Sequence, residues 1–572
     1  MKHFQIILFH VMLCLICNLS CVLSISAEVV LDGTLGISKA LQGPDYTVKS
    51  DYGKASGANL FHSFQSLTVE SHESVTFTGP DYIKNIISRV TGGQSSWIDG
   101  VLRSNIPYAN LYLLNPAGVI FGKNAALDVS GSFHVSTADY LRMGEQDRFY
   151  STPFQGDVLS IASPTAFGFL QDAPAPITFE GGDVSQVSGL QVPDGETISV
   201  IGGDIDIQEG TFYVKESLDA DGKPIQKIKN SGNLLAFSGR VNIASVASTG
   251  EVIPTEHDLD VSSVSKLGQI TLSNRSYIDV SGERSGDVYI RAERFMAQNS
   301  NIYGETYGDI DGGRIDIRST DVALSDGTQV IVNTYGYGKG SDLNIQAKED
   351  VVISGDNGKE TRSGIMIQSE NGQTGNLTIQ AKNIHLEDGG FIYANTYGMG
   401  DGGDITLDAE DNLNIVGLSS DLHSSEILVQ TFGTMKNAGN AGNLTINAGK
   451  DITFNDGGWI SSYTYGLGNG GQVNIKAGES ITFLGEIDGY PSSIYAAAHE
   501  TSNGGNGGDI DIVTKNLSLK DGAYLNASTF GPGYSGQIRI NAEESVELSG
   551  ASSKGWATGM YSDSTPKIDV AG

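Results

Sequence analysis

The second half of the chain repeats an alternation of apolar and polar residues. In each unit, two apolar residues flank one polar residue, as Ile405 and Leu407 flank Thr406. This period of two predicts a strand with one buried face and one polar face. A second alternating segment follows in each unit, and a third ends in a recurring Thr-aromatic-Gly sequence, as at residues 464–466. The pattern therefore predicts three strands in each unit.

The units recur with a base period of 28 residues. The polar residue before the first strand marks each unit, and successive markers lie 27, 28, 34, 28, 39, 29, 37 and 28 residues apart. Three strands of about five residues plus three turns account for one unit. The markers are Asp287, Arg314, Asp342, Asn376, Asp404, Asn443, Gln472, Asp509 and Gln537.

This pattern predicts an all-β fold in which each unit is one coil of a parallel β-helix. Stacked coils bury their apolar residues in one continuous core, and each coil contacts only its neighbours. Parallel crossovers prefer a right-handed path, so we expect a right-handed solenoid. A β-propeller needs about 40–50 residues per blade, which is longer than the base unit. Helical solenoids need an apolar period of 3.6 rather than two.

The first half of the chain is less regular but continues the strand pattern. Residues 136–180 interrupt it with four prolines, which predicts a loop-rich excursion or extra-helical subdomain. Elsewhere the alternation indicates strands at Ile198–Ile207, Leu234–Ile243, Gln269–Leu272 and Tyr277–Val280.

The composition agrees with many short strands and tight turns. The chain has 74 glycines and 14 prolines, and glycine supplies the positive φ that such turns need. Its formal net charge is −32, which favours a solvated acidic surface and disfavours nucleic acid as a partner. Divalent cations at Asp-rich turns are a second interpretation of these charges, although the turns lack the strict spacing of calcium-binding nonapeptide repeats.

Residues 1–27 have the pattern of a secretory signal peptide. Lys2 and His3 precede the apolar segment Ile6–Leu23, and Ser24–Ala27 supplies small residues for cleavage. A membrane anchor is the alternative, because the apolar segment is long. All three cysteines of the chain lie in this segment, so the mature chain has no disulfide scaffold.

Several motifs follow in a fixed order after this segment. They are Asn59–Phe64 (NLFHSF), Val75–Pro80 (VTFTGP), Ile86–Gly93 (IISRVTGG), Ile98–Ser104 (IDGVLRS), Ala109–Gly122 (ANLYLLNPAGVIFG) and Leu127–Leu141 (LDVSGSFHVSTADYL). Through these motifs, residues 30–170 resemble the haemagglutination-activity, or two-partner-secretion, domain of filamentous-haemagglutinin-like exoproteins.

The resemblance implies a right-handed β-helix whose N-terminal cap is formed by the export domain. It also implies export through a dedicated outer-membrane barrel partner, by way of the periplasm of a Gram-negative type of envelope, to the cell surface or medium. We therefore expect a signal peptide at 1–27, the secretion domain at 28–165, irregular coils at 166–285 and regular repeats at 286–572. The toxin-delivery role of longer relatives is not indicated, because no C-terminal segment differs in composition.

The site residues come from the same resemblance. The Asn-Pro-Asn-Gly motif of the family maps onto Asn115, Pro116, Ala117 and Gly118, so alanine replaces its second asparagine. Asn-Pro followed by Gly indicates a turn between two apolar strands, while the resemblance implies contact with the export partner. Both interpretations stay open. Asn59, Phe61 and Phe64 belong to the first export-domain motif.

The residues do not predict catalysis, a metal or a cofactor. Asp316 and Asp511 occupy equivalent outward strand positions, but other units have Asn, Thr or Arg there, which favours a scattered polar ladder over a catalytic pair. Zinc-binding spacings of His and Cys are missing from the sequence. The Thr-aromatic-Gly ladder is either a flat binding face or a stack that keeps the coils in register, and we favour the stack.

The pattern therefore predicts a secreted or surface adhesin rather than an enzyme. The solenoid would serve as a stalk, and insertions at Asp356–Arg362, Gly417–Ser424 and Gly485–Ser493 would contact a host-cell, surface or glycan receptor. The alternative is a secreted β-helix polysaccharide lyase or hydrolase, which requires carboxylates from neighbouring coils to converge in a groove. At the C-terminus, Lys567–Val570 resembles a strand cut off within the array.

Overall fold

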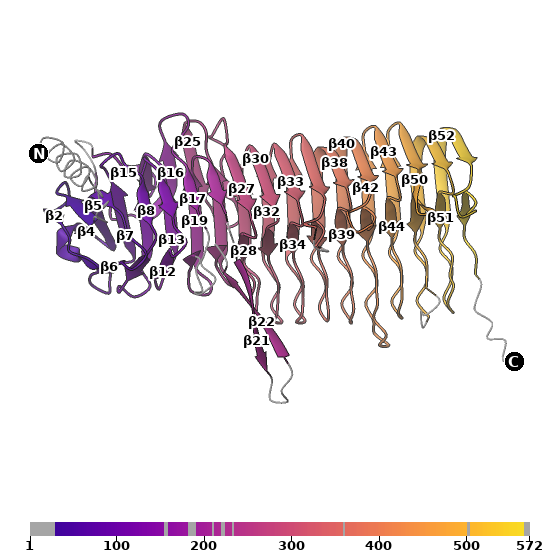
Figure 1. Ribbon diagram of the computed structural model, residues 1–572, viewed down its shortest axis with the longest axis horizontal. Helices are drawn as coiled ribbons and strands as arrows, with labels where there is room; N and C mark the ends of the chain where they lie inside the picture. Colours follow the sequence, from indigo (N-terminus) through magenta and orange to yellow (C-terminus); the bar gives the residue numbers. More distant parts are fainter. Residues whose placement is uncertain are drawn as a thin grey trace, which may run out of the picture.

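The chain forms a long rod of stacked coils, and successive coils follow one another along its axis (Figure 1). This structure is a computed structural model, and it describes residues 29–153, 158–180, 190–208, 211–218, 224–231, 234–358, 361–499 and 504–564. The expected signal peptide at 1–27 and the C-terminal Lys567–Val570 lie outside the described residues. Within the described ranges we find no helix with the length and apolar character of a membrane span.

The first face of the rod is a parallel sheet made by the first strand of each coil. Its apolar residues point inward, and Ile315 and Ile317 lie in register with Leu343 and Ile345 of the next coil. The strands are β5 (Asn59–Leu67), β7 (Asn85–Val90), β10 (Asn110–Leu114), β13 (Phe133–Ser136), β19 (Thr197–Gly202), β24 (Arg240–Ser245), β29 (Asp287–Arg291), β32 (Arg314–Ser319), β35 (Asp342–Ala347), β38 (Leu377–Glu387), β40 (Ile405–Val416), β42 (Leu444–Ala448), β45 (Val473–Ala477), β50 (Ile510–Lys520) and β52 (Ile538–Ser549).

The second face follows a corner after the first. The long strands β38, β40, β50 and β52 run through that corner and pair on both faces. The other strands of this face are β8 (Ser96–Ile98), β11 (Val119–Phe121), β17 (Ile177–Phe179), β20 (Ile205–Ile207), β27 (Gln269–Ser273), β30 (Arg294–Gln298), β33 (Asp321–Ser325), β36 (Asp350–Ser354), β43 (Asp451–Asn455) and β46 (Ser480–Leu484).

The third face consists of two parallel sheets that follow each other along the rod. The N-terminal sheet contains β3 (Asp45–Lys49), β6 (Ser74–Thr78), β9 (Val101–Ser104) and β12 (Ala126–Asp128). The second sheet contains β18 (Leu190–Gln191), β23 (Leu234–Leu235), β28 (Tyr277–Asp279), β31 (Asn301–Tyr303), β34 (Gln329–Ile331), β37 (Gly364–Met366), β39 (Phe391–Tyr393), β41 (Glu426–Leu428), β44 (Trp459–Ser461), β49 (Ser493–Tyr495), β51 (Tyr524–Asn526) and β53 (Gly559–Tyr561).

One hydrophobic core runs between the three faces. Its buried apolar side chains extend without a break from Val29 to Ala527. The predicted all-β parallel β-helix is therefore confirmed, and each alternating segment of the repeats lies on the face that the period of two assigns to it.

Antiparallel strands cap the N-terminal end of this core. Strand β1 (Val29–Asp32) pairs antiparallel with β2 (Ser38–Ala40) and with β5, and β4 (Lys54–Ser56) also pairs antiparallel with β5. The 3-10 turn Ser50–Tyr52 connects β3 to β4. Parallel stacking then begins between β5 and β7. The cap satisfies backbone groups that an open first coil would expose, and it protects that edge from other chains.

A second, antiparallel sheet leaves the helix, as predicted for residues 136–180. It is more ordered than the expected loop, and it places β15 (Asp147–Tyr150), β14 (Tyr140–Met143), β16 (Pro164–Phe169), β25 (Gly250–Pro254) and β26 (Leu259–Asp260) side by side. The expected boundary at 165/166 falls inside β16, so this sheet joins the two segments that the boundary was meant to separate. Figure 1 also shows a hairpin of β21 (Thr211–Leu218) and β22 (Pro224–Ser231) projecting away from the rod.

The marker residues form a side-chain ladder between coils. The Asp342 carboxylate accepts a hydrogen bond from the backbone N–H of Asn376 (2.9 Å), and the Asn376 side chain accepts one from Asp404 N–H (3.0 Å). The Asp404 carboxylate accepts the next from Asn443 N–H (2.9 Å). The Asp and Asn markers therefore each satisfy a backbone donor that no strand partner reaches, which explains the preference for these residues at this position.

A column of glycines precedes the markers at the place where the coils approach most closely. A Cβ atom on Gly403 would lie 1.8 Å from the carbonyl oxygen of Gly375, and one on Gly442 would lie 1.9 Å from the oxygen of Gly403. The same contact recurs at Gly471 and Gly508. These contacts are with backbone atoms, so no side-chain rotation relieves them. The high glycine content is therefore set largely by coil-to-coil distance.

Replacement of one such glycine should destabilise the stack locally. We expect Gly403→Ala to lower the free energy of unfolding by about 1–3 kcal/mol or more, because the new methyl group forces neighbouring backbones apart. The shift in the midpoint of urea unfolding measures this effect. Gly358→Asn is the control, because Gly358 has open space around it and asparagine tolerates its positive φ of 66°. An equal shift in both variants would contradict the close-approach argument.

Candidate functional site

The Asn115 motif forms a corner between β10 and β11, as the sequence predicts. The Asn115 side chain is fully buried, and its amide donates to the Gln94 carbonyl and to Ser96 Oγ (both 3.0 Å). Its oxygen accepts from Ala117 N–H (3.0 Å), while the Asn115 carbonyl accepts from Gly118 N–H (3.0 Å). All polar groups of this side chain are thus used inside the protein. Gly118 adopts φ +110°, which suits glycine at this turn.

The surface of the same corner is formed by neighbouring residues rather than by Asn115. Gln94 and Ser95 are exposed, while Pro116 and Ala117 are partly exposed. The Pro176 carbonyl in the next coil accepts a hydrogen bond from Val119 N–H (3.3 Å), so three successive turns stack here. Any contact of this motif with another protein would involve the exposed turn residues, with Asn115 holding them in place.

The other predicted site residues attach the helix to the extra-helical sheet. Asn59 is buried and donates to the carbonyls of Ser160 (2.9 Å) and Ala162 (2.7 Å). Phe61 packs against Phe149 of β15, with ring centroids 4.9 Å apart, in a second hydrophobic cluster outside the helix. The structure separates Phe64 from these residues, because Phe64 points into the main core.

Sequence reasoning missed the central role of Arg89 in this attachment. The side chain is 1% exposed and donates to the Tyr150 carbonyl (2.7 Å) and to Ser63 Oγ (2.9 Å), with its guanidinium over the Phe149 ring. A buried arginine in an otherwise apolar motif was the available signal, because such a charge is retained only with several partners.

Two histidines of the export-domain motifs are uncharged: His62 is fully buried, and His134 is partly buried. His62 lies near Phe77, and neither of its ring nitrogens has a hydrogen-bond partner among the described residues. Burial lowers the pKa of His62 to about 4 and that of His134 to about 3. The His134 ring stacks on Tyr112 with centroids 4.3 Å apart, and its Nδ1 lies 2.9 Å from Ser199 Oγ. Both rings are therefore neutral in the folded state near pH 7.

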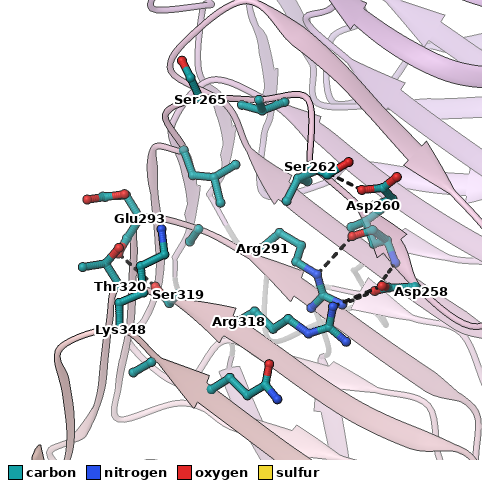
Figure 2. A pocket seen from close by; sticks show the side chains of 17 residues that line it. Asp258, Asp260, Ser262, Ser265, Arg291, Glu293, Arg318, Ser319, Thr320 and Lys348 are labelled. Atoms are coloured by element: carbon teal, nitrogen blue, oxygen red, sulfur yellow. Dashed lines mark hydrogen bonds and ion pairs between the residues drawn. The ribbon is translucent and has the colours of Figure 1, made fainter. Parts of the chain in front are cut away.

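An ion-pair cluster fastens the extra-helical sheet to the first regular coils (Figure 2). Arg291 binds the carboxylates of Asp258 and Asp316, and its Nη2 lies 2.8 Å from Asp316 Oδ1. Arg318 also binds both, with Nη1 3.1 Å from Asp258 and Nε 3.0 Å from Asp316. Burial raises the pKa of Asp258, but the hydrogen bond and charge of Arg291 outweigh it, and the pKa lies below its usual value.

The position of Asp316 corrects a sequence prediction. Its side chain points away from the core, as the alternation requires, but it is 1% exposed rather than part of a solvated ladder. The segment containing β26 folds over this strand face and seals it. Asp511, at the equivalent position, is partly exposed and pairs with Arg539 (3.1 Å). The repeat pattern alone did not show that a distant segment covers one coil.

A cavity of about 460 Å³ lies beside this cluster, under the same covering segment. Figure 2 shows Arg291, Arg318 and Asp258 at one end and Glu293, Thr320 and Lys348 at the other. The cavity is lined by equal numbers of acidic and basic side chains. The two carboxylates that converge here, Asp258 and Asp316, are both bound by guanidinium groups, so they are not free to act as an acid and base pair. Among the described residues, no group of three or more His, Cys, Asp or Glu is placed to hold a metal ion.

The predicted contact insertions share one corner of the rod and alternate with short turns. We call residues 355–358, 361–363, 417–425, 485–492 and 550–558 the ridge. Its segments lie in every second coil, while Asp388-Gly389, Asp456-Gly457 and Asp521-Gly522 close the coils between them. Three of the insertions were predicted from the sequence, but the fourth, at 550–558, and the alternation were not.

The ridge segments contact one another across the intervening coils. The Asp356 carboxylate accepts hydrogen bonds from Ser420 N–H (2.6 Å) and Oγ (2.7 Å). Further along, Glu486 accepts from Ser553 N–H (2.7 Å), and Lys554 lies over the Tyr490 ring. The ridge segments are thus joined in two pairs, and the Asp456-Gly457 turn lies between the pairs. The ridge carries exposed apolar side chains of Leu422, Tyr490 and Trp556.

The Thr-aromatic-Gly positions form a stack, as we favoured. The threonines of successive coils are buried and form a continuous line of bridges from Thr396 through Thr431 to Thr464. The rings of Phe432 and Tyr465 stack with centroids 4.7 Å apart and an interplanar angle of 4°. This spacing is close to the strand separation of about 4.8 Å, so the rings follow the coil repeat.

Comparison with known proteins finds similarity in the N-terminal half of the chain. The model of the TPS secretion domain family matches residues 27–290. Among curated proteins, the chain is similar to the heme/hemopexin-binding protein of Haemophilus influenzae (strain ATCC 51907 / DSM 11121 / KW20 / Rd), with 38% identity over 85 residues. The match covers 15% of this chain and 9% of that protein.

A solved structure is also similar. The chain aligns with the crystal structure of the HMW1 secretion domain from Haemophilus influenzae at a TM-score of 0.39 and 14% identity. The alignment covers 90% of this chain and 100% of that chain.

The two neutral histidines, His62 and His134, should make the N-terminal coils sensitive to acid. Their pKa values are lowered by folding, so the unfolded chain binds more protons between about pH 6.5 and the folded values. Stability is then fully present above pH 6.5 and falls as the pH drops towards 4, by about 1.4 kcal/mol for each unit of pKa shift. We expect His62→Phe to flatten the pH dependence of the urea midpoint. His257→Asn is the control, because His257 is exposed; equal flattening there would contradict the assignment.

Breaking the ion-pair cluster should be costly. Arg291→Met leaves the buried Asp316 with one partner fewer, and we expect a loss of about 3–5 kcal/mol in the free energy of unfolding. The double variant Arg291→Met with Asp316→Leu should recover most of this loss, because no unpaired charge stays buried. Arg294→Met is the matched control, since its ion pair with Asp321 is exposed and contributes about 0–1 kcal/mol. No recovery in the double variant would argue against the cluster as the cause.

Proposed function

Residues 27–290 belong to the TPS secretion domain family, which directs exoproteins through two-partner export, and we propose that the whole chain is an adhesin exported in this way. Its partner would be an outer-membrane barrel transporter, and its destination the cell surface or the medium beyond a Gram-negative type of envelope. The observation that carries the export proposal is the family match across the cap, the corner motif and the extra-helical sheet.

The stacking of the coils along the rod supports this route. The cap covers one end of the core, and β5 offers a single parallel edge to β7. Every later coil pairs with the coil before it, so ordered coils can be added one at a time outside the cell. Stacked hydrogen bonds then oppose return of the chain, and folding outside draws the remainder outward.

We assign recognition by the transporter to the exposed turns around the corner motif. Asn115, Pro116 and Gly118 fix the backbone of that corner, and Gln94, Ser95 and Ala117 supply accessible atoms. Asn59 and Phe61 contribute indirectly, because they hold the extra-helical sheet beside the same coils.

The adhesin role rests on the ridge. A soluble rod does not need exposed aromatic residues on a surface built by insertions, and such residues are typical of binding surfaces. The polysaccharide lyase or hydrolase alternative requires free convergent carboxylates, whereas Asp258 and Asp316 are held in ion pairs. The structure therefore supports binding better than catalysis.

Export should depend on the secretion domain and on the corner surface. Deletion of residues 28–165 should leave the chain in the periplasm, where it is degraded; normal export of this deletion would refute the proposal.

Ala117→Arg should reduce export in cells that express the barrel partner without lowering the urea midpoint, because residue 117 is accessible. Asn115→Ala should reduce both export and stability, since it removes the three side-chain hydrogen bonds of the corner. Lys123→Ala, outside the corner, is the control for export.

Adhesion should depend on the ridge. We expect the double variant Tyr490→Ser with Trp556→Ser to bind cells or immobilised glycans at least about tenfold more weakly than the unaltered chain, because exposed aromatic residues dominate such interfaces. Secretion of this variant should be unchanged, which separates adhesion from export. Tyr534→Ser, an exposed tyrosine outside the ridge, is the matched control. Equal losses in both would locate binding elsewhere on the rod.

A further inference from the structure

The column of stacked aromatic rings is interrupted at one coil. Tyr307 and Tyr335 stack with centroids 5.6 Å apart, and Tyr397, Phe432 and Tyr465 form a second stack. The coil between the two stacks places Glu370 at the aromatic position. Its backbone keeps the register, because Glu370 N–H donates to Thr334 O and Tyr397 N–H donates to Ser369 O (both 2.8 Å). Only the side chain differs there.

The same coil is also one residue shorter. The stretch from the threonine position to the marker has nine residues at 334–342 and 396–404 but eight at 369–376. Gly338, Gly372 and Gly400 stack directly, since a Cβ on Gly372 would lie 2.1 Å from Gly338 O and one on Gly400 would lie 2.0 Å from Gly372 O. The missing residue is therefore the counterpart of Tyr337 and Met399.

The shortened coil leaves the neighbouring side chains uncovered. Tyr337 is 63% exposed, Tyr397 45% and Met399 44%, whereas Phe432 and Tyr465 inside the second stack are only partly exposed. We call Tyr335, Tyr337, Glu370, Tyr397 and Met399 the interruption. Among the described residues, no side chain forms a hydrogen bond or ion pair with the Glu370 carboxylate. Burial raises the pKa of Tyr335, and the negative charges of Glu305 and Glu370 raise it further.

We propose that the interruption binds a methylated ammonium group between Tyr335 and Tyr397, with Glu370 neutralising its charge. The rings of each stack face along the rod, with interplanar angles of 28° and 13° to their next neighbours. The last ring of each stack therefore faces the coil that contains Glu370. The two rings lie two coils apart, which is about 10 Å at the strand spacing of a parallel sheet.

This separation selects the shape of the cation. A charge midway between the rings lies about 5 Å from each centroid, within the range of about 6 Å over which cation–π attraction operates. A globular methylated ammonium group fills that distance and contacts both rings. A flat guanidinium group contacts a ring at about 3.5–4 Å and so reaches only one of them. The polarisable thioether of Met399 adds a van der Waals contact at the edge of this site.

The net charge of the chain agrees with a cationic ligand. The formal charge is −32, so the rod attracts cations from a distance. The interruption is a different surface from the ridge, and its binding of a cation does not depend on export or adhesion.

Titration of the full chain with tetramethylammonium chloride, followed by NMR line broadening of the probe, tests the site. We expect Glu370→Gln to weaken binding about tenfold, since it removes the neutralising charge. Glu370→Tyr should abolish binding while keeping or raising the urea midpoint, because it completes the aromatic column. Glu283→Gln is the matched control: Glu283 occupies the same position before Tyr307 but has an aromatic neighbour on one side only. Guanidinium chloride at equal ionic strength should bind more weakly.

The outcomes decide both the site and the source of the ligand. Unchanged binding in Glu370→Gln, an equal loss in Glu283→Gln, or equal binding of guanidinium would overturn the proposal. If the site holds, phosphocholine and phosphatidylcholine vesicles test a lipid source, and a trimethyllysine peptide tests a protein source. Tighter binding of one than of free tetramethylammonium assigns the source, and binding of neither in the unaltered chain overturns the proposal.

Discussion

The structure depends on one repeated interaction, the parallel backbone ladder between neighbouring coils. Because equivalent residues lie one strand spacing apart, every side chain meets its counterpart from the coil before and the coil after. The core, the glycine column, the marker ladder and the aromatic column are four consequences of this single constraint. Large apolar residues suit the inside, hydrogen-bonding residues suit the corners, and glycine is needed where backbones touch.

In a stack of this kind, each coil contacts only the coils next to it. The ends of the rod and its covered sides are therefore stabilised by additional sheets. The antiparallel cap closes the N-terminal end, and the extra-helical sheet covers the first face next to it. Charged residues hold that sheet at both of its margins, with Arg89 at one and Arg291 with Arg318 at the other. Burying these charges is favourable only because each has several partners. The irregular half of the rod is therefore held by specific polar contacts, while the regular half is held by repetition.

The sequence was sufficient for the features that repeat. The alternation at Ile405–Leu407, the period of the markers and the Thr-aromatic-Gly positions all follow from local chemistry, and the structure confirms their placement. The corner at Asn115 was also predictable, because Asn-Pro and Gly favour a turn wherever they occur. The burial of Asp316 was not predictable, because the residues that cover it lie about 55 positions earlier in the sequence and belong to no repeat. Likewise, the alternation of the ridge insertions becomes visible only when the coils are stacked.

Function in a β-helix is to be sought where the repeat is broken. A residue inside the repeat is constrained by its neighbours in both adjacent coils, so its identity is explained by stacking. An insertion, a deletion or a change of residue type costs stacking energy that the coil itself does not recover. The ridge adds residues in every second coil, and the coil of Glu370 loses one residue together with its aromatic ring. Both departures leave the core strands in register, as the pairing of Ile365 with Ile392 and of Ile427 with Ile460 shows. They therefore change only the outer surface, which is the part of the rod that another molecule can reach.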